Sequence, residues 1–115
     1  MLTLREMLAL VKGELLTPGL DLEAGCSKVF ASDLMSDVLA FSEPGSTLIT
    51  GLVNAHVVRT ACLVDAMGII VVQGKRPNAA VVDEAAAKML PIIATGCSMF
   101  EACSRISGNL PDGMR

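Results

Sequence analysis

The sequence predicts an α/β fold in which a mostly parallel sheet is flanked by helices. Three times in the second half of the chain, a short apolar run ends in a turn rich in glycine and small polar residues, and a helix-like stretch follows. These pairs are 47–51 with 54–67, 68–74 with 78–90, and 91–96 with 98–106. The alternation is typical of β-α repeats with parallel strands. Because the loops after parallel strands meet at one edge of a sheet, a ligand site is expected there.

The first half of the chain predicts a helix, a strand and a second short helix. Thr3 and Glu6 have the spacing of a capping box, so a helix is expected within residues 1–14. Residues 26–31 are predicted as a strand and residues 34–41 as a helix that Ser32 or Asp33 caps.

The second half carries the clearest local signals. Residues 69–72 are Ile-Ile-Val-Val, four β-branched residues in a row that favour a strand covered on both faces. Ser98 and Glu101 form a second capping box that predicts the start of the last helix. Residues 108–115 are expected to fray. No linker or low-complexity segment divides the chain, so residues 1–115 are expected to form a single domain.

The composition excludes several classes of function. Aromatic residues make up 3% of the chain, which argues against a stacking platform for single-stranded nucleic acid. The formal net charge is −3 and there is no run of basic residues, so no nucleic-acid partner is expected. No apolar stretch approaches the roughly 20 residues that span a bilayer, so no membrane association is expected.

The hydropathy of the chain predicts an oligomer. Mean hydropathy is +0.58 and 52% of residues are apolar. High hydropathy in short segments implies strands buried on both faces or an apolar surface patch, and such a patch in a small domain commonly marks a subunit interface. We therefore expect a homodimer. The first residues lack the pattern of a secretory signal, so a cytoplasmic location is expected.

The four cysteines do not form a metal site or a redox motif. They stand at positions 26, 62, 97 and 103 without a Cys-x-x-Cys, and His56 is the only histidine. Free thiols, no metal and no cofactor are therefore expected. Cys97 precedes a helix, where the dipole can activate a thiol, but a buried thiol with a packing role is favoured because His56 is the only available imidazole.

The loop of Gly74, Lys75 and Arg76 is the strongest candidate for binding an anion. It follows a predicted strand, carries two cations and precedes a helix N-terminus. It does not match the P-loop pattern, because Gly68 and Gly74 are one residue too far apart and Arg76 occupies the hydroxyl position. The alternative is a solvated turn in which Pro77 and Asn78 start the helix.

The two neighbouring loops complete the expected ligand site. His56, Arg59 and Thr60 share a spacing that places them on one helical face, which could line a pocket or a dimer contact; the alternative is an exposed polar face. No nucleophile and base are paired in the sequence, so no catalytic residue is expected. The expected ligand-binding residues are Gly51, Asn54, His56, Gly74, Lys75, Arg76, Thr95 and Ser98.

Several segments, in order, resemble the DRTGG domain family. They are residues 28–36 (KVFASDLMS), 49–51 (ITG), 69–77, 91–95 (PIIAT) and 98–101 (SMFE). The resemblance covers most of the chain from about residue 15 onward. It implies the fold of the N-terminal domain of HPr kinase/phosphorylase and a noncatalytic regulatory or dimer-forming role. HPr kinase chemistry belongs to a separate P-loop domain, so the resemblance does not imply serine kinase activity.

Three functions follow as hypotheses. The first is a regulatory module, homodimeric through an apolar face, that holds a small anionic or nucleotide-like ligand at the strand-end loops. The second is an adaptor that binds a protein partner, such as an anaerobic redox or metabolic enzyme complex, without a small ligand. The third and least favoured is an enzyme that uses the Cys97 thiol or transfers phosphate with Lys75, because both residues lack the partners such chemistry requires.

Overall fold

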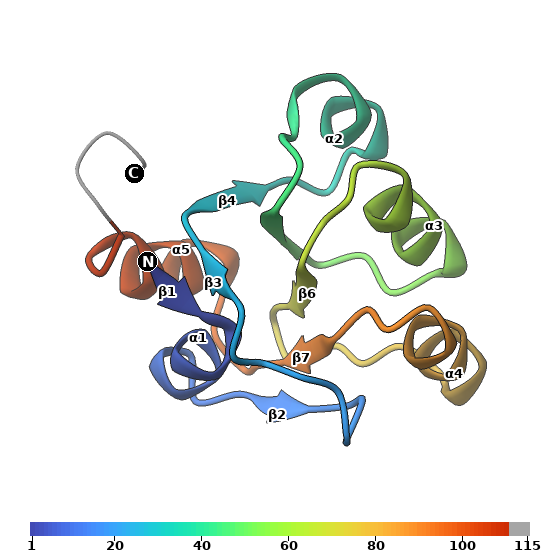
Figure 1. Cartoon of the computed structure of the whole chain (residues 1–115), viewed down its shortest axis with the longest axis horizontal. Coiled ribbons are helices and arrows are strands. Elements are labelled where there is room, and N and C mark those ends of the chain that lie inside the picture. The colour runs from blue at the N-terminus through green and yellow to red at the C-terminus, as the bar shows by residue number, and fades with distance from the viewer. Residues whose placement is uncertain (111–115) are drawn as a thin grey trace.

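A single five-stranded sheet forms the centre of the molecule. The computed structural model describes residues 1–110. The strand order is β2-β7-β6-β5-β4, and a separate two-stranded ladder joins β1 to β3 (Figure 1). The strands are β1 (Leu2–Thr3), β2 (Glu14–Leu15), β3 (Gly25–Cys26), β4 (Lys28–Ala31), β5 (Ser46–Thr50), β6 (Gly68–Val71) and β7 (Ile92–Ala94).

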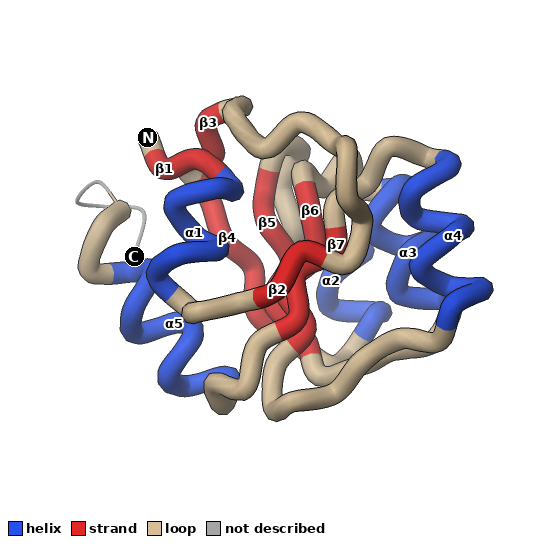
Figure 2. Tube along the Cα trace, turned by 90° about the horizontal axis from the view of Figure 1, so that it is seen from below, coloured by secondary structure: helices blue, strands red, loops and turns tan. Residues whose placement is uncertain are grey.

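Five helices cover the two faces of this sheet. They are α1 (Leu4–Leu10), α2 (Met35–Phe41), α3 (Ala55–Leu63), α4 (Ala79–Ala87) and α5 (Met99–Ser107). Figure 2 shows α1 and α5 on one face of the sheet and α2, α3 and α4 on the other. The predicted α/β class, with a mostly parallel sheet flanked by helices, is confirmed.

The strands β4 to β7 are parallel, as the sequence predicts. Leu48 of β5 pairs with Ile69 of β6, and Ile69 pairs with Ile92 of β7. The exception is β2, which pairs antiparallel with β7. This two-residue strand carries no sequence signal that separates it from a turn. The predicted strand 26–31 is divided, because its first residue pairs with β1 while Lys28–Ala31 pairs with β5.

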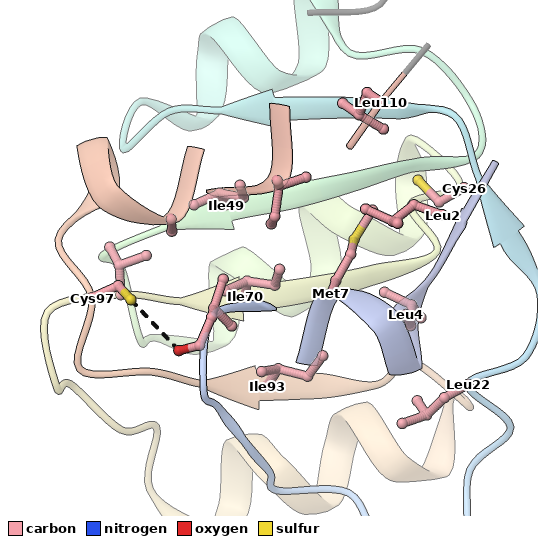
Figure 3. Packing of buried hydrophobic residues seen from close by; sticks show 14 residues of the cluster. Leu2, Leu4, Met7, Leu22, Cys26, Ile49, Ile70, Ile93, Cys97 and Leu110 are labelled. Atoms are coloured by element: carbon pink, nitrogen blue, oxygen red, sulfur yellow. Dashed lines mark hydrogen bonds between the residues drawn. The ribbon is translucent and has the colours of Figure 1, made fainter. Parts of the chain in front are cut away.

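Two hydrophobic layers hold the helices to the sheet. Ile49, Ile70 and Ile93 face α1 and α5, where they pack with Leu4 and Met7 (Figure 3). Their neighbours along the strands face the other way: Leu48, Ile69 and Ile92 pack with residues of α2, α3 and α4. All residues of β6 are buried, so the prediction of a strand covered on both faces is confirmed.

Both predicted capping boxes are present. The Thr3 hydroxyl accepts from the Glu6 N–H, and the Ser98 hydroxyl accepts from the Glu101 N–H. In each box the glutamate side chain accepts in return from the backbone N–H of the cap residue. An i, i+4 ion pair joins Glu84 and Lys88 on α4, at 3.3 Å.

Three helices end earlier than predicted, and each ends in the same way. The residues after the C-caps of α1, α3 and α4 are Lys12, Asp65 and Met89, with φ of 50°, 55° and 58°. The next N–H in each case donates to the carbonyl five residues earlier, as Leu90 does to Ala85 at 2.9 Å. This is the Schellman motif, which usually carries glycine at the left-handed position. Because glycine is absent from these positions, the sequence gives no stop signal there.

Met89→Gly is expected to stabilise the fold by about 1 kcal/mol, since a left-handed backbone costs about that much in a residue with a Cβ. The side chain of Met89 is 76% exposed, so little packing is lost. Urea denaturation measures the change. As a matched control, Lys88→Gly places glycine at a φ of −94° and is expected to destabilise. If Met89→Gly destabilised as much as the control, the description of this helix end would be wrong.

The end of the described chain belongs to the core. Leu110 is buried and packs in the layer beneath α1 and α5. The sequence analysis assigned it to a fraying tail, but the apolar contacts of this one side chain hold it against the domain. The remaining residues of the expected tail, 111–115, lie outside the described residues.

Candidate functional site

The strand-end loops expected to share a rim do lie at one edge of the sheet. The parallel register of β4 to β7 brings the carboxyl ends of these strands together. Two hydrogen bonds tie the loop after β6 to the loop after β7. The Gly74 N–H donates to the Thr95 carbonyl at 2.9 Å, and the Gln73 N–H donates to the Cys97 carbonyl at 2.7 Å.

Asp33 joins the ends of β4 and β5. Its Oδ1 accepts from the Gly51 N–H at 2.7 Å and from the Thr50 hydroxyl at 2.9 Å. The prediction that Asp33 caps the following helix is wrong: the N-cap residue is Leu34, and no side chain caps the helix. The carboxylate is used instead to fasten the neighbouring strand end.

Lys75 reaches the same point of the rim. A Cβ placed on Gly51 would lie 3.7 Å from Lys75 Nζ and 3.5 Å from Asp33 Oδ1. The small residue at position 51 therefore leaves room for the ammonium group beside the end of β5. Loops after β4, β5 and β6 thus converge on Gly51.

An open hollow of about 210 Å³ lies between this rim and the turn that follows α1. We call it the cationic hollow. Three of its lining residues are basic and one is acidic, so the surroundings of the hollow are positive in a chain whose net charge is −3. The lining residues are Lys12, Gly13, Glu14, Gly74, Lys75, Arg76, Ala94, Thr95 and Gly96.

Arg76 and Glu14 form an ion pair at the mouth of the cationic hollow. Both guanidinium nitrogens, Nη1 and Nη2, lie 3.0 Å from a carboxylate oxygen of Glu14, in bidentate geometry. The hydrogen bonds and charge of Arg76 lower the pKa of Glu14 below its ordinary value, and those of Glu14 raise the pKa of Arg76. Glu14 therefore remains ionised at neutral pH and keeps the guanidinium of Arg76 paired.

Thr95 lines the cationic hollow but has a structural role. Its side chain is buried, and its hydroxyl donates to the Val11 carbonyl at 2.6 Å and accepts from the Cys97 N–H at 3.1 Å. The first bond holds the turn that carries Lys12 against the end of β7. The Thr95 hydroxyl is therefore engaged within the protein, and ligand contacts in the hollow are expected from the neighbouring residues.

The other predicted site residues lie elsewhere. Ser98 caps α5 and is not among the lining residues of the hollow. His56 is exposed on α3, and Asn54 lines a narrow apolar crevice between α3 and α4.

The predicted polar face of α3 is divided. Thr60 is buried, while Arg59 points to α4 and lies 3.4 Å from a carboxylate oxygen of Glu84. Burial removes Thr60 from the predicted face, and the exposed polar face consists of His56 and Arg59. Of the eight predicted ligand residues, the structure brings Gly74, Lys75, Arg76 and Thr95 into one hollow and places Gly51 beside it.

The N-terminal side of the hollow is not among the predicted ligand-binding residues. The sequence predicts a helix that runs to Lys12 with a stop at Gly13, but the helix ends at Leu10, Lys12 adopts a left-handed backbone, and the chain continues into the edge strand β2. The sequence marks this turn only by Gly13, a residue without a side chain that lets another strand come close to the backbone. A Cβ on Gly13 would lie 2.6 Å from Ile93 Cγ2, so glycine is required where the turn crosses β7.

Cys97 is a buried thiol, as favoured from the sequence. Its Sγ lies 3.5 Å from the Val11 carbonyl, the contact dashed in Figure 3. Burial raises the pKa of the Cys103 thiol. In residues 1–110, no group of three or more His, Cys, Asp or Glu side chains is placed to hold a metal ion.

Comparison with known proteins identifies the fold. No protein-family model matches the sequence, and no curated protein matches it. A solved structure does match: the CBS and DRTGG domains of the regulatory region of Clostridium perfringens pyrophosphatase, in complex with the activator diadenosine tetraphosphate. The TM-score is 0.75 at 20% sequence identity, over 95% of this chain. The chain has a DRTGG-like fold.

The resemblance predicted from the sequence is thus confirmed at the level of the fold. The DRTGG-like chain spans about half the length of the pyrophosphatase region, since the match covers 47% of it. Within residues 1–110, helices long and apolar enough to cross a bilayer are absent.

Proposed function

We propose that the DRTGG-like chain is a noncatalytic regulatory module that senses a small anionic ligand in the cationic hollow. The observation that carries this proposal is the convergence of Lys12, Lys75 and Arg76 around an open hollow at the carboxyl edge of the parallel sheet. Ligands of open α/β sheets bind at this edge. The solved neighbour is a regulatory region bound to an activator that carries phosphates, which supports the same class of function.

The chemistry of the hollow favours binding over catalysis. Its nine lining residues include no histidine, cysteine or serine. The Thr95 hydroxyl is occupied by two hydrogen bonds, and the Cys97 thiol is buried behind it. General base and nucleophilic catalysis both need such groups within reach of a ligand. The lysines can neutralise the charge of a bound anion.

Glu14 competes with an anion for Arg76. Glu14→Gln removes a negative charge from the mouth of the hollow and releases the guanidinium, so it is expected to tighten binding of inorganic phosphate about two- to fivefold. Isothermal titration calorimetry at neutral pH, where the lowered pKa of Glu14 keeps the carboxylate ionised, measures the change.

Glu43→Gln is the matched control for this experiment. Glu43 is also an exposed carboxylate in an ion pair, with Lys28, but it lies outside the hollow. It is expected to leave phosphate binding unchanged. Equal effects of the two variants would show that net charge alone governs binding. Absence of phosphate binding to the unaltered chain and to Glu14→Gln would refute the proposed function.

We further propose that the module is a homodimer that pairs through α2 and the edge strand β4. In the described sheet, β4 pairs only with β5, and an open edge is a template for a second copy of the chain. Beside it, α2 and the residue before it expose apolar side chains: Leu34 is 57% exposed, Leu39 53% and Phe41 69%. Their side chains would be buried between two copies.

Phe41→Glu is expected to shift the dimer to monomer at micromolar concentration, because the interface would bury an unpaired charge. Sedimentation velocity measures the oligomer. Phe100→Glu is the control, since Phe100 is 81% exposed on α5, away from α2. A monomeric unaltered chain, or a dimer that Phe41→Glu leaves intact, would contradict this interface.

A cytoplasmic location is also proposed for the module. All four cysteines are free thiols, which is compatible with a reducing compartment.

A further inference from the structure

A second hollow adjoins the cationic hollow on the other side of the Arg76–Glu14 ion pair. Its volume is about 400 Å³, and it lies between the chain that follows β2 and the first turns of α4. The two hollows share only Glu14 and Arg76. The second is lined by Glu14, Leu15, Leu16, Pro18, Arg76, Pro77, Ala79, Val82 and Asp83.

The two hollows differ in chemistry. The cationic hollow is lined by two basic residues, Lys12 and Lys75, besides the shared ion pair. Six of the nine residues around the second hollow have apolar side chains, and the carboxylate of Asp83 is the only charge there besides the shared ion pair. A ligand that fills both therefore needs an anionic end and a body with apolar faces and a few polar edges.

We infer that the ligand is a nucleoside monophosphate whose phosphate binds in the cationic hollow and whose base occupies the second. This inference rests on the proposed function and names the class of ligand. A nucleobase has apolar faces and hydrogen-bonding edges, which matches Leu15, Leu16 and Pro18 beside Asp83. The guanidinium of Arg76 stands at the junction, where it can stack on the base or pair with the phosphate. A volume of about 400 Å³ lies within the range of about 300–1,000 Å³ typical of small-molecule sites.

A sugar phosphate fits this pair of hollows less well. Its body is polar on every face, so Leu15, Leu16 and Pro18 would desolvate hydroxyl groups without replacing their hydrogen bonds. An inorganic anion would leave the second hollow empty. The ranking expected from the structure is therefore nucleoside monophosphate first, with sugar phosphate and inorganic phosphate similar to one another.

Calorimetric titration of the full chain tests this ranking with six probes: the four common ribonucleoside 5′-monophosphates, glucose 6-phosphate and inorganic phosphate. At least one nucleotide is expected to bind about tenfold more tightly than inorganic phosphate, since the base gains contacts with the apolar side chains and the polar groups of the second hollow. Ala79→Leu narrows the second hollow without a change of charge and is expected to remove most of that advantage while phosphate binding stays the same. Ala80→Leu is the matched control, because Ala80 is exposed on the same helix but lines neither hollow.

The outcomes separate this inference from the proposed function. If phosphate binds but every nucleotide binds no better than glucose 6-phosphate, the nucleotide inference fails and the anion-sensing function stands. A nucleotide advantage that survives Ala79→Leu unchanged also overturns the inference, because the base would then lie outside the second hollow. If none of the six probes binds, both the inference and the proposed function fall.

Discussion

Replacing Lys12 and Lys75 together with alanine is expected to weaken the binding of inorganic phosphate by about hundredfold, because each lost charge-assisted hydrogen bond accounts for about tenfold. The two lysines line the cationic hollow from different segments, Lys12 from the turn after α1 and Lys75 from the loop after β6. Calorimetric titration of the double variant against the unaltered chain measures the loss. Each single variant is expected to lose about tenfold.

Lys28→Ala with Lys88→Ala is the charge-matched control. Both lysines are engaged in surface ion pairs, with Glu43 and Glu84 respectively, and neither lines the hollow. This control removes the same two positive charges from the protein. If it weakened phosphate binding as much as the Lys12 and Lys75 pair, the anion would respond to the overall field of the protein and the assignment of the hollow would be wrong.

Thr95→Val is expected to lower the free energy of unfolding by about 1–3 kcal/mol, since it removes a hydrogen bond from two buried backbone groups and leaves the carbonyl of the pair with only the weak Cys97 thiol, 3.5 Å away. The groups are the Val11 carbonyl and the Cys97 N–H. Because the variant keeps the shape of the side chain, cavity formation does not contribute. Urea denaturation measures the loss. The turn that carries Lys12 is also released from β7, so phosphate binding is expected to weaken in the same variant.

Thr60→Val provides the comparison. Thr60 is also buried, but the structure shows no hydrogen bond from its hydroxyl to a backbone group of a neighbouring segment within residues 1–110, and no buried side-chain polar atom there is left without a partner. The change is expected to stay within about 0.5 kcal/mol. Similar losses of unfolding free energy in the two variants would mean that both hydroxyls contribute through packing or solvation. The stabilising role assigned to the hydrogen bonds of Thr95 would then be refuted.

Much of the fold can be predicted from local sequence patterns. The β-branched run at Ile69–Val72 has little alternative to a buried strand, and the parallel direction of its neighbours follows from the helices between them. The capping boxes at Thr3 and Ser98 fix two helix starts through side chains only three residues apart. These signals act within a few residues, and for that reason they are visible without a structure.

The parts that were missed depend on contacts distant in sequence. The carboxylate of Asp33 looks like a helix cap in its own segment, but its partners, Thr50 and Gly51, follow 17 and 18 residues later, at the end of the next strand. Glu14 pairs with Arg76 across 62 positions. Pairings of this kind are determined by the sheet order, in which β2 lies beside β7.

The candidate site was half predictable for the same reason. Gly74, Lys75 and Arg76 stand on a loop that any parallel β-α unit would place at the sheet edge. Lys12 was assigned to a helix, because its left-handed backbone has no marker in the sequence. His56, the only histidine, is a predicted ligand residue, but it lies in the first turn of α3 and is exposed to solvent. Chemical rarity is therefore a weaker guide to this site than position on the fold.

The central claim is that an anion binds at the cationic hollow, and NMR titration tests it most directly. Inorganic phosphate is added to the ¹⁵N-labelled chain, and the shifts of the backbone amides are followed residue by residue. The largest shifts are expected at Gly13, Gly74, Lys75 and Gly96, which line the hollow from both sides. Saturable shifts that cluster instead at Asn54 and His56, or no saturable shifts at all, would contradict the claim.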